Sequence, residues 1–312
     1  MTAEQHPAAV TAAAGRSDLV PGVFLQAELV LDVHATLAEG PVWDARRGLL
    51  WWTDIPEGSV HAFDPVRAQD ARFRAGGPVG ALTLRGDGSL LLAMQDSFAT
   101  LDPASGRVET ILALPPEPHP RRANDGKCDP RGRFLVGRMA LDESEGCGDL
   151  YRLDADRCVT RLLDNLTIPN GLAWRADGRE LYFIDSPRRQ VTAYPYDVVT
   201  GTLGLGRALV RFEGDAVPDG MTTDADGCLW VALWGGGRVL CVSPGGEILA
   251  TVGLPVSQVS SCTFGGPGLD ELYITTAREG FGPDDDAREP LAGCLFRVRP
   301  GVRGHLPVPF AG

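Results

Sequence analysis

The sequence predicts an all-β fold, a six-bladed β-propeller. Three observations lead to it: a strand-like unit that recurs six times, turn residues suited to tight hairpins, and very little helical periodicity. The repeat is marked by six turn glycines, Gly48, Gly88, Gly132, Gly178, Gly227 and Gly268. Their spacings of 40, 44, 46, 49 and 41 residues match the length of one four-stranded propeller blade.

Each repeat begins with a polar turn that leads into an apolar, strand-like run. The six segments are WDARRGLLWWTDI, LRGDGSLLLAMQ, CDPRGRFLVGRM, WRADGRELYFIDS, TDADGCLWVALW and FGGPGLDELYITTA. Glycine in these turns supplies the positive φ that a tight hairpin needs, and the following Leu, Val, Tyr, Trp and Phe are typical of buried strands. A second run ending in a turn follows most of them: SVHAFDPV, FATLDPASG, DLYRLDAD, QVTAYPYD, GRVLCVSPGG and CLFRVRPG.

The 312 residues fit one propeller domain over residues 23–312, preceded by a flexible tail at residues 1–22. The tail is rich in Ala and small polar residues. It lacks the basic start and the continuous apolar stretch of a secretion signal. The acidic run at residues 284–286 is interpreted as a surface loop, because runs of like charge are usually solvated.

Composition excludes several classes of partner. The net charge of −12 disfavours binding to nucleic acid and to anionic lipid, and no run of eighteen apolar residues predicts a membrane span. The seven cysteines form no CxxC pair and are odd in number. We interpret them as reduced, mostly buried thiols of a cytoplasmic protein. Nothing in the sequence indicates an obligatory protein partner.

Polar residues interrupt the blade pattern in four places, just before an apolar strand. The segments are AEGPVW with Glu39, RANDGKCDPRG with Arg122, Asn124 and Asp125, IPNGLAW with Asn170, and VPDGMTTDADG with Asp219. Singly, an Asp or Asn before Gly is most often a turn residue. In a propeller, however, equivalent positions of different blades face the same axial opening. We therefore expect these side chains to converge, with the adjacent glycines bending the backbone sharply.

The same segments closely resemble the senescence-marker-protein/gluconolactonase/luciferin-regenerating-enzyme family, also called the regucalcin family. The resemblance extends from Leu31 to Val298 and includes NDGKCDPRGRFLVGRM and SCTFGGPGLDELYITTAREG. It implies one divalent metal in the central channel, a small-molecule sugar lactone as substrate, and lactonase activity. The implied metal ligands are Glu39, Asn170 and Asp219. The implied substrate contacts are Arg122, Asn124 and Asp142.

An oxygen-only ligand set suits Ca, Mg or Mn, and Zn or Fe(II) also accept carboxylate oxygen. Such a cation can polarise the lactone carbonyl and activate a water that attacks it. Arg122 would help the cation to stabilise the resulting oxyanion. Asp219 is the predicted catalytic residue, and sequence alone leaves open whether it acts as a base or only as a ligand.

Two other functions are compatible with the sequence. One is a propeller that binds calcium or another ligand without turnover. The other is a related six-bladed esterase that acts on aryl esters or organophosphates. The segment LLWWTDI is also similar to the YWTD repeat of extracellular receptor propellers, but only one blade carries it.

Overall fold

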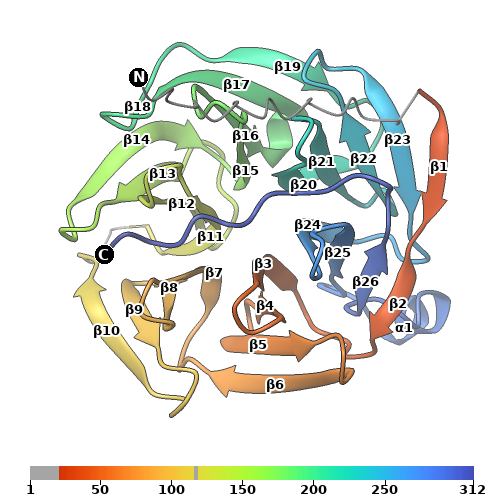
Figure 1. Ribbon diagram of the computed structural model, residues 1–312, viewed down its shortest axis with the longest axis horizontal. Helices are drawn as coiled ribbons and strands as arrows, with labels where there is room; N and C mark the ends of the chain where they lie inside the picture. The colour runs from red at the N-terminus through yellow and green to blue at the C-terminus, as the bar shows by residue number, and fades with distance from the viewer. Residues whose placement is uncertain (1–20, 116–118) are drawn as a thin grey trace, which may run out of the picture.

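The computed structural model describes residues 21–115 and 119–312, which form six β-sheets arranged in a ring (Figure 1). The predicted six-bladed propeller is therefore confirmed. Residues 1–20 of the predicted tail lie outside the described residues.

Blades 1 to 4 are built from consecutive strands, with the first strand of each nearest the axis. Blade 1 contains β3 (Ala38–Asp44), β4 (Leu49–Asp54), β5 (Ser59–Asp64) and β6 (Gln69–Arg74). Blade 2 contains β7 (Val79–Leu84), β8 (Leu90–Met94), β9 (Ser97–Leu101) and β10 (Val108–Ala113). Blade 3 contains β11 (Arg121–Cys128), β12 (Phe134–Ala140), β13 (Gly148–Leu153) and β14 (Val159–Leu166). Blade 4 contains β15 (Pro169–Trp174), β16 (Glu180–Asp185), β17 (Gln190–Asp197), β18 (Thr202–Leu203) and β19 (Arg207–Arg211).

Blades 5 and 6 each receive an outer strand from the N-terminal part of the chain. Blade 5 contains β20 (Val217–Thr223), β21 (Leu229–Trp234), β22 (Arg238–Val242) and β23 (Ile248–Gly253), with β1 (Val23–Gln26) parallel to β23. Blade 6 contains β24 (Val259–Gly265), β25 (Glu271–Thr276) and β26 (Leu295–Val298), with β2 (Glu28–Leu31) antiparallel to β26. Hydrogen bonds between β2 and β26 thus close the ring.

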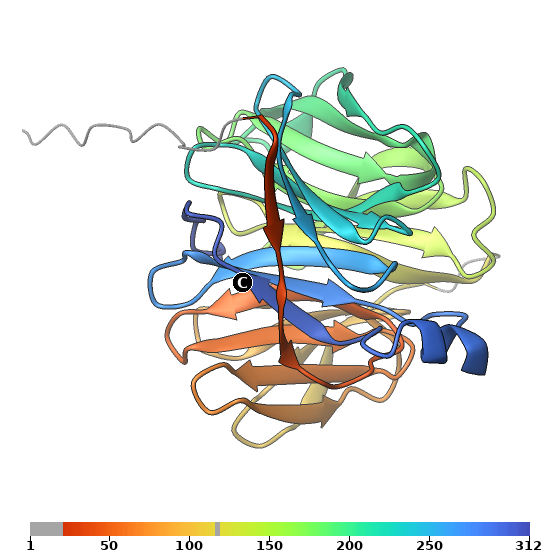
Figure 2. The same cartoon turned by 90° about the vertical axis from the view of Figure 1, so that its right-hand side faces the viewer.

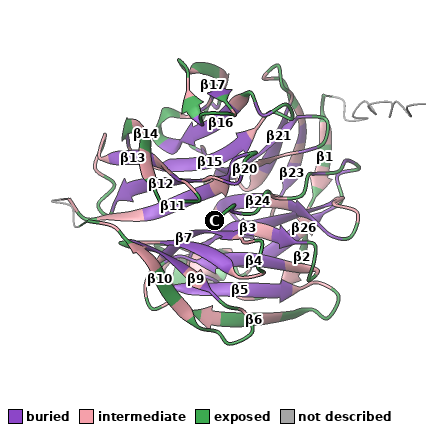
Figure 3. Ribbon diagram, turned by 60° about the vertical axis from the view of Figure 1, so that its left-hand side comes forward, coloured by how far each residue is buried: buried purple, intermediate pink, exposed green. Residues whose placement is uncertain are grey.

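The apolar core lies between adjacent blades, because each sheet covers the face of the next. The inner strands are almost entirely buried, whereas outer strands such as β6 and β10 show exposed residues (Figure 3). Trp51, Trp52 and Trp230 are among the largest fully buried side chains. Covering each blade's faces in this way is what makes six small sheets stable together.

Five of the six predicted turn glycines adopt the positive φ that a tight turn requires. Their φ angles are 66° for Gly48, 90° for Gly88, 77° for Gly132, 70° for Gly178 and 83° for Gly227. The sixth turn differs from the prediction: Gly266 (φ 80°) and Leu269 (φ 53°) have the left-handed conformation, and Gly268 does not.

A short helix, α1 (Pro283–Arg288), contains the acidic run, so the prediction of a loop there was wrong. Pro283 suits the first turn of a helix, and the negative side chains that follow interact favourably with the helix N-terminus. Asp285 also accepts a hydrogen bond from Gly282 N (3.0 Å). Figure 2 shows α1 projecting from the ring. A single 3-10 turn, η1 (Ser186–Arg188), follows β16. No helix in the described ranges is long and apolar enough to cross a membrane.

The C-terminal strap, residues 299–312, crosses the axis on the face where the first turn of each blade lies (Figure 1). Its backbone bonds to four blades through Ala225 N to Arg303 O, Gly304 N to Leu269 O, Phe310 N to Leu84 O, and Ala311 N to Gly132 O. An axial cavity of about 240 Å³ lies beneath residues 305–308 of the strap. The strap therefore covers this end of the channel.

Deleting residues 1–22 is expected to leave the melting temperature and activity nearly unchanged, because β1 begins only at Val23. Deleting residues 1–31 is the comparison. It removes β1 and β2, opens the ring, and should lower the melting temperature strongly. A large loss of stability with the shorter deletion would contradict the proposed domain boundary at residue 23.

Candidate active site

Each of the six innermost strands has a register shift at the same level of the channel. The shifts lie between Glu39 and Val42, Val79 and Ala81, Ala123 and Gly126, Pro169 and Leu172, Pro218 and Met221, and Val259 and Ser261. A β-bulge bends the strand and re-aims the side chains within it. Four of these bulges hold the polar segments found in the sequence, so the bulges account for a ring of polar side chains around the axis.

The glycines beside these residues are needed mainly for close packing of the inner strands. Only Gly40 has the left-handed backbone that the predicted sharp bend implies (φ 54°). A Cβ on Gly171 would lie 2.6 Å from Asp219 O, and one on Gly220 would lie 2.1 Å from Ser261 Oγ. Gly171 and Gly220 lie within bulges but lack the left-handed conformation, and the absence of a side chain there lets neighbouring blades meet.

Replacing Gly171 by Ala is expected to destabilise the protein by about 1–3 kcal/mol, the usual cost of overpacking. The added methyl would press on the backbone that carries Asp219. The matched control is Gly86→Ala, where a Cβ meets nothing within 4 Å. Thermal unfolding of both variants tests this, and equal melting temperatures would contradict the packing explanation.

Five of the six predicted site residues line one axial cavity of about 260 Å³: Glu39, Arg122, Asn124, Asn170 and Asp219. The rest of the lining comes from Leu37, Met139, Glu143, Ile168, Ser186, Val217, Trp234 and Glu279. These residues come from all blades except the second. The cavity is at the end of the channel away from the C-terminal strap, because the polar segments lie at the beginning of the inner strands.

A chain of hydrogen bonds fixes the amide side chains in this cavity. Arg122 Nη1 donates to Asn124 Oδ1 (2.6 Å), and Asn124 Nδ2 donates to Asn170 Oδ1 (3.0 Å). Asn170 Nδ2 donates to Ser186 Oγ (2.9 Å), whose hydroxyl donates to Pro218 O (2.7 Å). Asn170 Oδ1 therefore has a defined orientation and keeps a second lone pair for another partner.

The carboxylates of Glu39 and Asp219 are buried, with each residue only 5–6% exposed. Burial raises the pKa of Glu39 to about 8, and the negative charge of the nearby Asp125 is the second cause of this shift. Burial and the charges of Glu39 and Asp125 raise the pKa of Asp219 well above its usual value, while Arg122 opposes the shift. Glu39 accepts a hydrogen bond from Gly40 N (2.8 Å). Asp219 accepts none from the residues described, so its oxygens are available to a cation.

The metal-free protein is expected to lose stability as the pH rises through about 8. Because the pKa of Glu39 is 4.5 in an ordinary setting and about 8 here, the folded state holds the proton more tightly than the unfolded chain does. The resulting stabilisation is complete below pH 4.5 and is lost as the pH passes about 8. Melting temperatures of chelator-treated wild type and Glu39→Gln at about pH 6 and about pH 9 test this. An equal decrease in the two proteins would contradict it.

Three charged residues in or beside the cavity, Lys127, Glu143 and Glu279, were not predicted, and a fourth, Asp125, was noted in its polar segment but given no role. Asp125 and Lys127 follow Asn124 in β11, and Lys127 Nζ donates to Met221 O (2.7 Å). Burial raises the pKa of Asp125 and lowers that of Lys127. Their signal was the polar run NDGK in an otherwise apolar inner strand. Glu143 and Glu279 line the cavity from loops after β12 and β25, and no local sequence pattern distinguished them.

Asp142 is not among the residues that line the cavity. Its side chain is 62% exposed and accepts a hydrogen bond from His119 Nε2 (3.1 Å). Hydrogen bonds from Ser144 and His119 lower the pKa of Asp142 to about 2. The neighbouring Glu143 points to the cavity instead. A substrate contact by Asp142 therefore stays a prediction.

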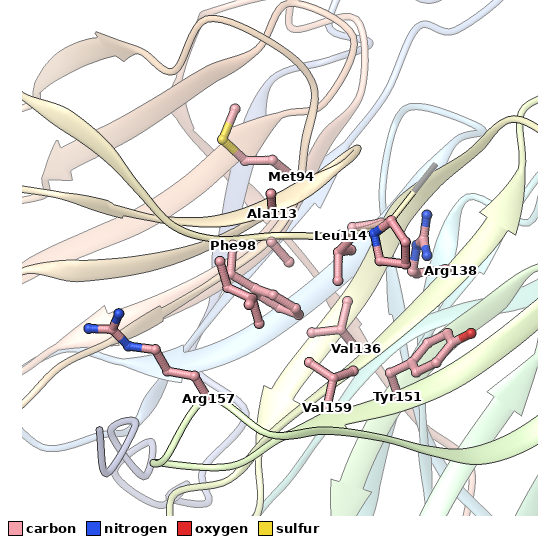
Figure 4. Close-up of a pocket in the computed structure, with 13 residues that line it drawn as sticks. Met94, Phe98, Ala113, Leu114, Val136, Arg138, Tyr151, Arg157 and Val159 are labelled. Carbon is pink, nitrogen blue, oxygen red and sulfur yellow. The ribbon is translucent and has the colours of Figure 1, made fainter. Parts of the chain in front are cut away.

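A third cavity, of about 380 Å³, lies away from the axis between blades 2 and 3 (Figure 4). Apolar side chains such as Phe98, Val136 and Val159 dominate its lining, with Arg138, Tyr151 and Arg157 at its edges. It contains none of the predicted site residues. The axial cavity, with its buried carboxylates, is thus the candidate active site.

Comparison with known proteins finds relatives that match most of the chain. The family model described as "SMP-30/Gluconolactonase/LRE-like region" matches residues 37–278. Regucalcin of Xenopus laevis is 36% identical, covering 92% of this chain and 99% of the relative. The putative sugar lactone lactonase YvrE of Bacillus subtilis is 35% identical with the same coverage. The solved structure of a calcium-binding protein, regucalcin, from Agrobacterium tumefaciens has a TM-score of 0.88 and 27% identity, covering 93% of this chain and 98% of that one.

Proposed function

Because the chain belongs to the SMP-30/gluconolactonase/LRE-like family, we propose that it is a metal-dependent lactonase that opens a sugar lactone. The strongest support is the cavity itself. Two buried carboxylates with raised pKa values, a fixed amide oxygen and a half-buried arginine line the same space. This combination suits a cation beside a polar substrate.

We assign Glu39, Asn170 and Asp219 as the residues that would hold one divalent cation. Their donor atoms are all oxygen, and two unneutralised carboxylates at this depth would be costly. When bound, the cation supplies Lewis-acid polarisation of the ester carbonyl. The donor set is compatible with Ca, Mg, Mn, Zn or Fe(II).

The chain's own groups would bind and orient the lactone. The half-buried Arg122 guanidinium, which lines the cavity, is the group to stabilise negative charge on the carbonyl oxygen. Asn124 is held by Arg122 and Asn170, and we propose that it contacts a sugar hydroxyl. Glu143 and Glu279 offer further hydroxyl acceptors. We assign to Asp219 the acceptance of the proton from the attacking water, because its buried carboxylate lines the cavity and accepts no hydrogen bond from the described residues.

We also propose a cytoplasmic location, because all seven cysteines are unpaired and Cys158 is an exposed thiol. No partner beyond the small-molecule lactone is needed for this function.

The second candidate function is calcium binding without turnover, and the name of the Agrobacterium relative, a calcium-binding protein, favours it. A panel of aldonolactones and aryl esters, assayed with a pH indicator with and without added metal, separates the possibilities. The lactonase is expected to hydrolyse lactones only after metal is restored to chelated protein. Metal binding without hydrolysis of any panel member would favour the binding propeller, and preference for aryl esters would indicate an esterase.

A further inference from the structure

A cluster of three side chains lies where the N-terminal strand β2 joins β26 and closes the ring. Asp32 and His34 directly follow β2, and Cys294 directly precedes β26. The side chains of Asp32 and His34 are 62% and 43% exposed, whereas Cys294 is buried. The cluster is separate from the axial cavity, whose lining contains none of the three.

The three donor atoms have the spacing of a metal site. His34 Nε2 lies 2.8 Å from Asp32 Oδ1. Cys294 Sγ lies 3.4 Å from Asp32 Oδ1 and 3.9 Å from His34 Nδ1. One ligand atom from each residue lies within 4.8 Å of the others. Zinc bonds of about 2.0 Å to N or O and about 2.3 Å to S, at tetrahedral angles, separate ligand atoms by roughly 3.3–3.5 Å. The distance of 3.4 Å between Cys294 Sγ and Asp32 Oδ1 agrees with this separation, and one ring nitrogen of His34 lies within 4.8 Å of both atoms.

The surrounding backbone holds these groups in contact. A Cβ on Gly293 would lie 2.2 Å from Ala35 O, so glycine is required for the two segments to approach. Ala35 N donates to Gly293 O (2.8 Å) and fixes that approach. Burial raises the pKa of the Cys294 thiol, and the backbone N–H groups of His34 and Val33 oppose this shift by favouring the thiolate.

We propose that Asp32, His34 and Cys294 bind one borderline transition-metal ion of the Zn²⁺ class at the closure of the ring. Thiolate, imidazole and carboxylate are the ligands that zinc prefers. The exposed side of the cluster leaves a fourth position for water. This site differs in chemistry from the oxygen-only axial site, so it stands whether or not the protein is a lactonase.

Another cluster, Asp224, Cys228 and Cys241, also has close donor atoms. Its carboxylate is already used: Asp224 Oδ1 accepts from Asp226 N and Cys228 N, and Oδ2 accepts from Trp230 Nε1 (3.0 Å). All three residues are buried. It is therefore a turn anchored by hydrogen bonds, and it provides an internal control.

A metal bound by the ring-closure cluster would connect residues that are 262 and 260 positions apart in sequence. Binding to the folded state alone raises stability by mass action, and linking distant segments restricts the unfolded chain. Zn²⁺ is thus expected to raise the melting temperature, and the increase should be smaller in Cys294→Ser than in wild type, since the axial site is unchanged in that variant.

Cobalt titration tests the site directly, because Co²⁺ bound to a thiolate gives a near-ultraviolet charge-transfer band that an oxygen-only site cannot produce. The full chain, chelated and reduced, is titrated with Co²⁺ and then with competing Zn²⁺. Wild type should show the band at one equivalent per chain, and Zn²⁺ should remove it. Cys294→Ser should abolish the band, whereas Cys228→Ser and Asp219→Asn should retain it.

His34→Asn is a second variant in case the serine variant does not fold. His34 has a left-handed backbone (φ 51°), which Asn tolerates, so only the imidazole is lost. Its apparent affinity for Co²⁺ should fall at least about ten-fold, the lower limit seen even for outer-shell changes. No band in wild type, or a band that survives Cys294→Ser and disappears in Cys228→Ser, would overturn the proposal.

Discussion

Asp219→Asn is expected to lower kcat/KM for lactone hydrolysis by about 10²- to 10⁴-fold, the range for loss of a general base. The substitution preserves shape but removes a charge that we assign to both metal binding and proton transfer. Burial and the Glu39 charge already raise the pKa of Asp219, so Asn relieves repulsion in the metal-free cavity. The metal-free variant should therefore melt at or above the temperature of metal-free wild type.

The measurement combines steady-state kinetics with thermal melts, before and after chelation and with metals titrated back. Asp215→Asn is the matched control, because Asp215 is exposed four residues earlier and should leave activity unchanged. Full activity in verified metal-free wild type would exclude the mechanism. Equal restoration of wild type and Asp219→Asn by metal would remove Asp219 from its role while leaving the metal in place.

Arg122→Ala is expected to lower kcat/KM about ten- to a thousand-fold while metal binding survives. The guanidinium lines the axial cavity, half-buried, and donates to Asn124 Oδ1 at 2.6 Å, so its loss removes both a positive charge and the support of Asn124. Calorimetric metal titration and lactone kinetics on the same preparation separate the two effects.

Two further variants sharpen the result for Arg122. Arg131→Ala, in an exposed turn of the same blade, should behave as wild type. A double-mutant cycle with Asn124→Ala should give a coupling of about 0.5–3 kcal/mol, because the two side chains are in contact. Loss of metal by Arg122→Ala would show that our division between metal ligands and substrate contacts is wrong.

The sequence was sufficient for the blades because each is a local unit with its own turn and strands. It did not indicate that β1 and β2 complete blades 5 and 6, since those pairings join residues more than 200 positions apart and leave no local pattern. Helix α1 was missed for a different reason. Six residues are too few for periodicity, and the helix depends on Pro283 and on the hydrogen bond between Asp285 and Gly282 N.

Within the candidate site, the predictable residues were those carried by the inner strands. Glu39, Asn124, Asn170 and Asp219 occupy equivalent bulges, so ring geometry alone brings them together. Glu143 and Glu279 were not predictable in this way, because they reach the cavity from loops whose course depends on packing over the blades. The same reason explains why Asp142 lies outside the lining although Glu143 belongs to it.

The C-terminal strap lies over the end of the channel opposite the candidate active site. For the proposed lactonase, the lactone would then enter, and the hydroxy acid formed from it would leave, through the end that the strap does not cover. We therefore expect the product to inhibit competitively, and slow departure of product to limit turnover at high substrate concentration. On this proposal, substrate entry and product release use the same end of the channel. The residues around that end would govern the rates of both steps.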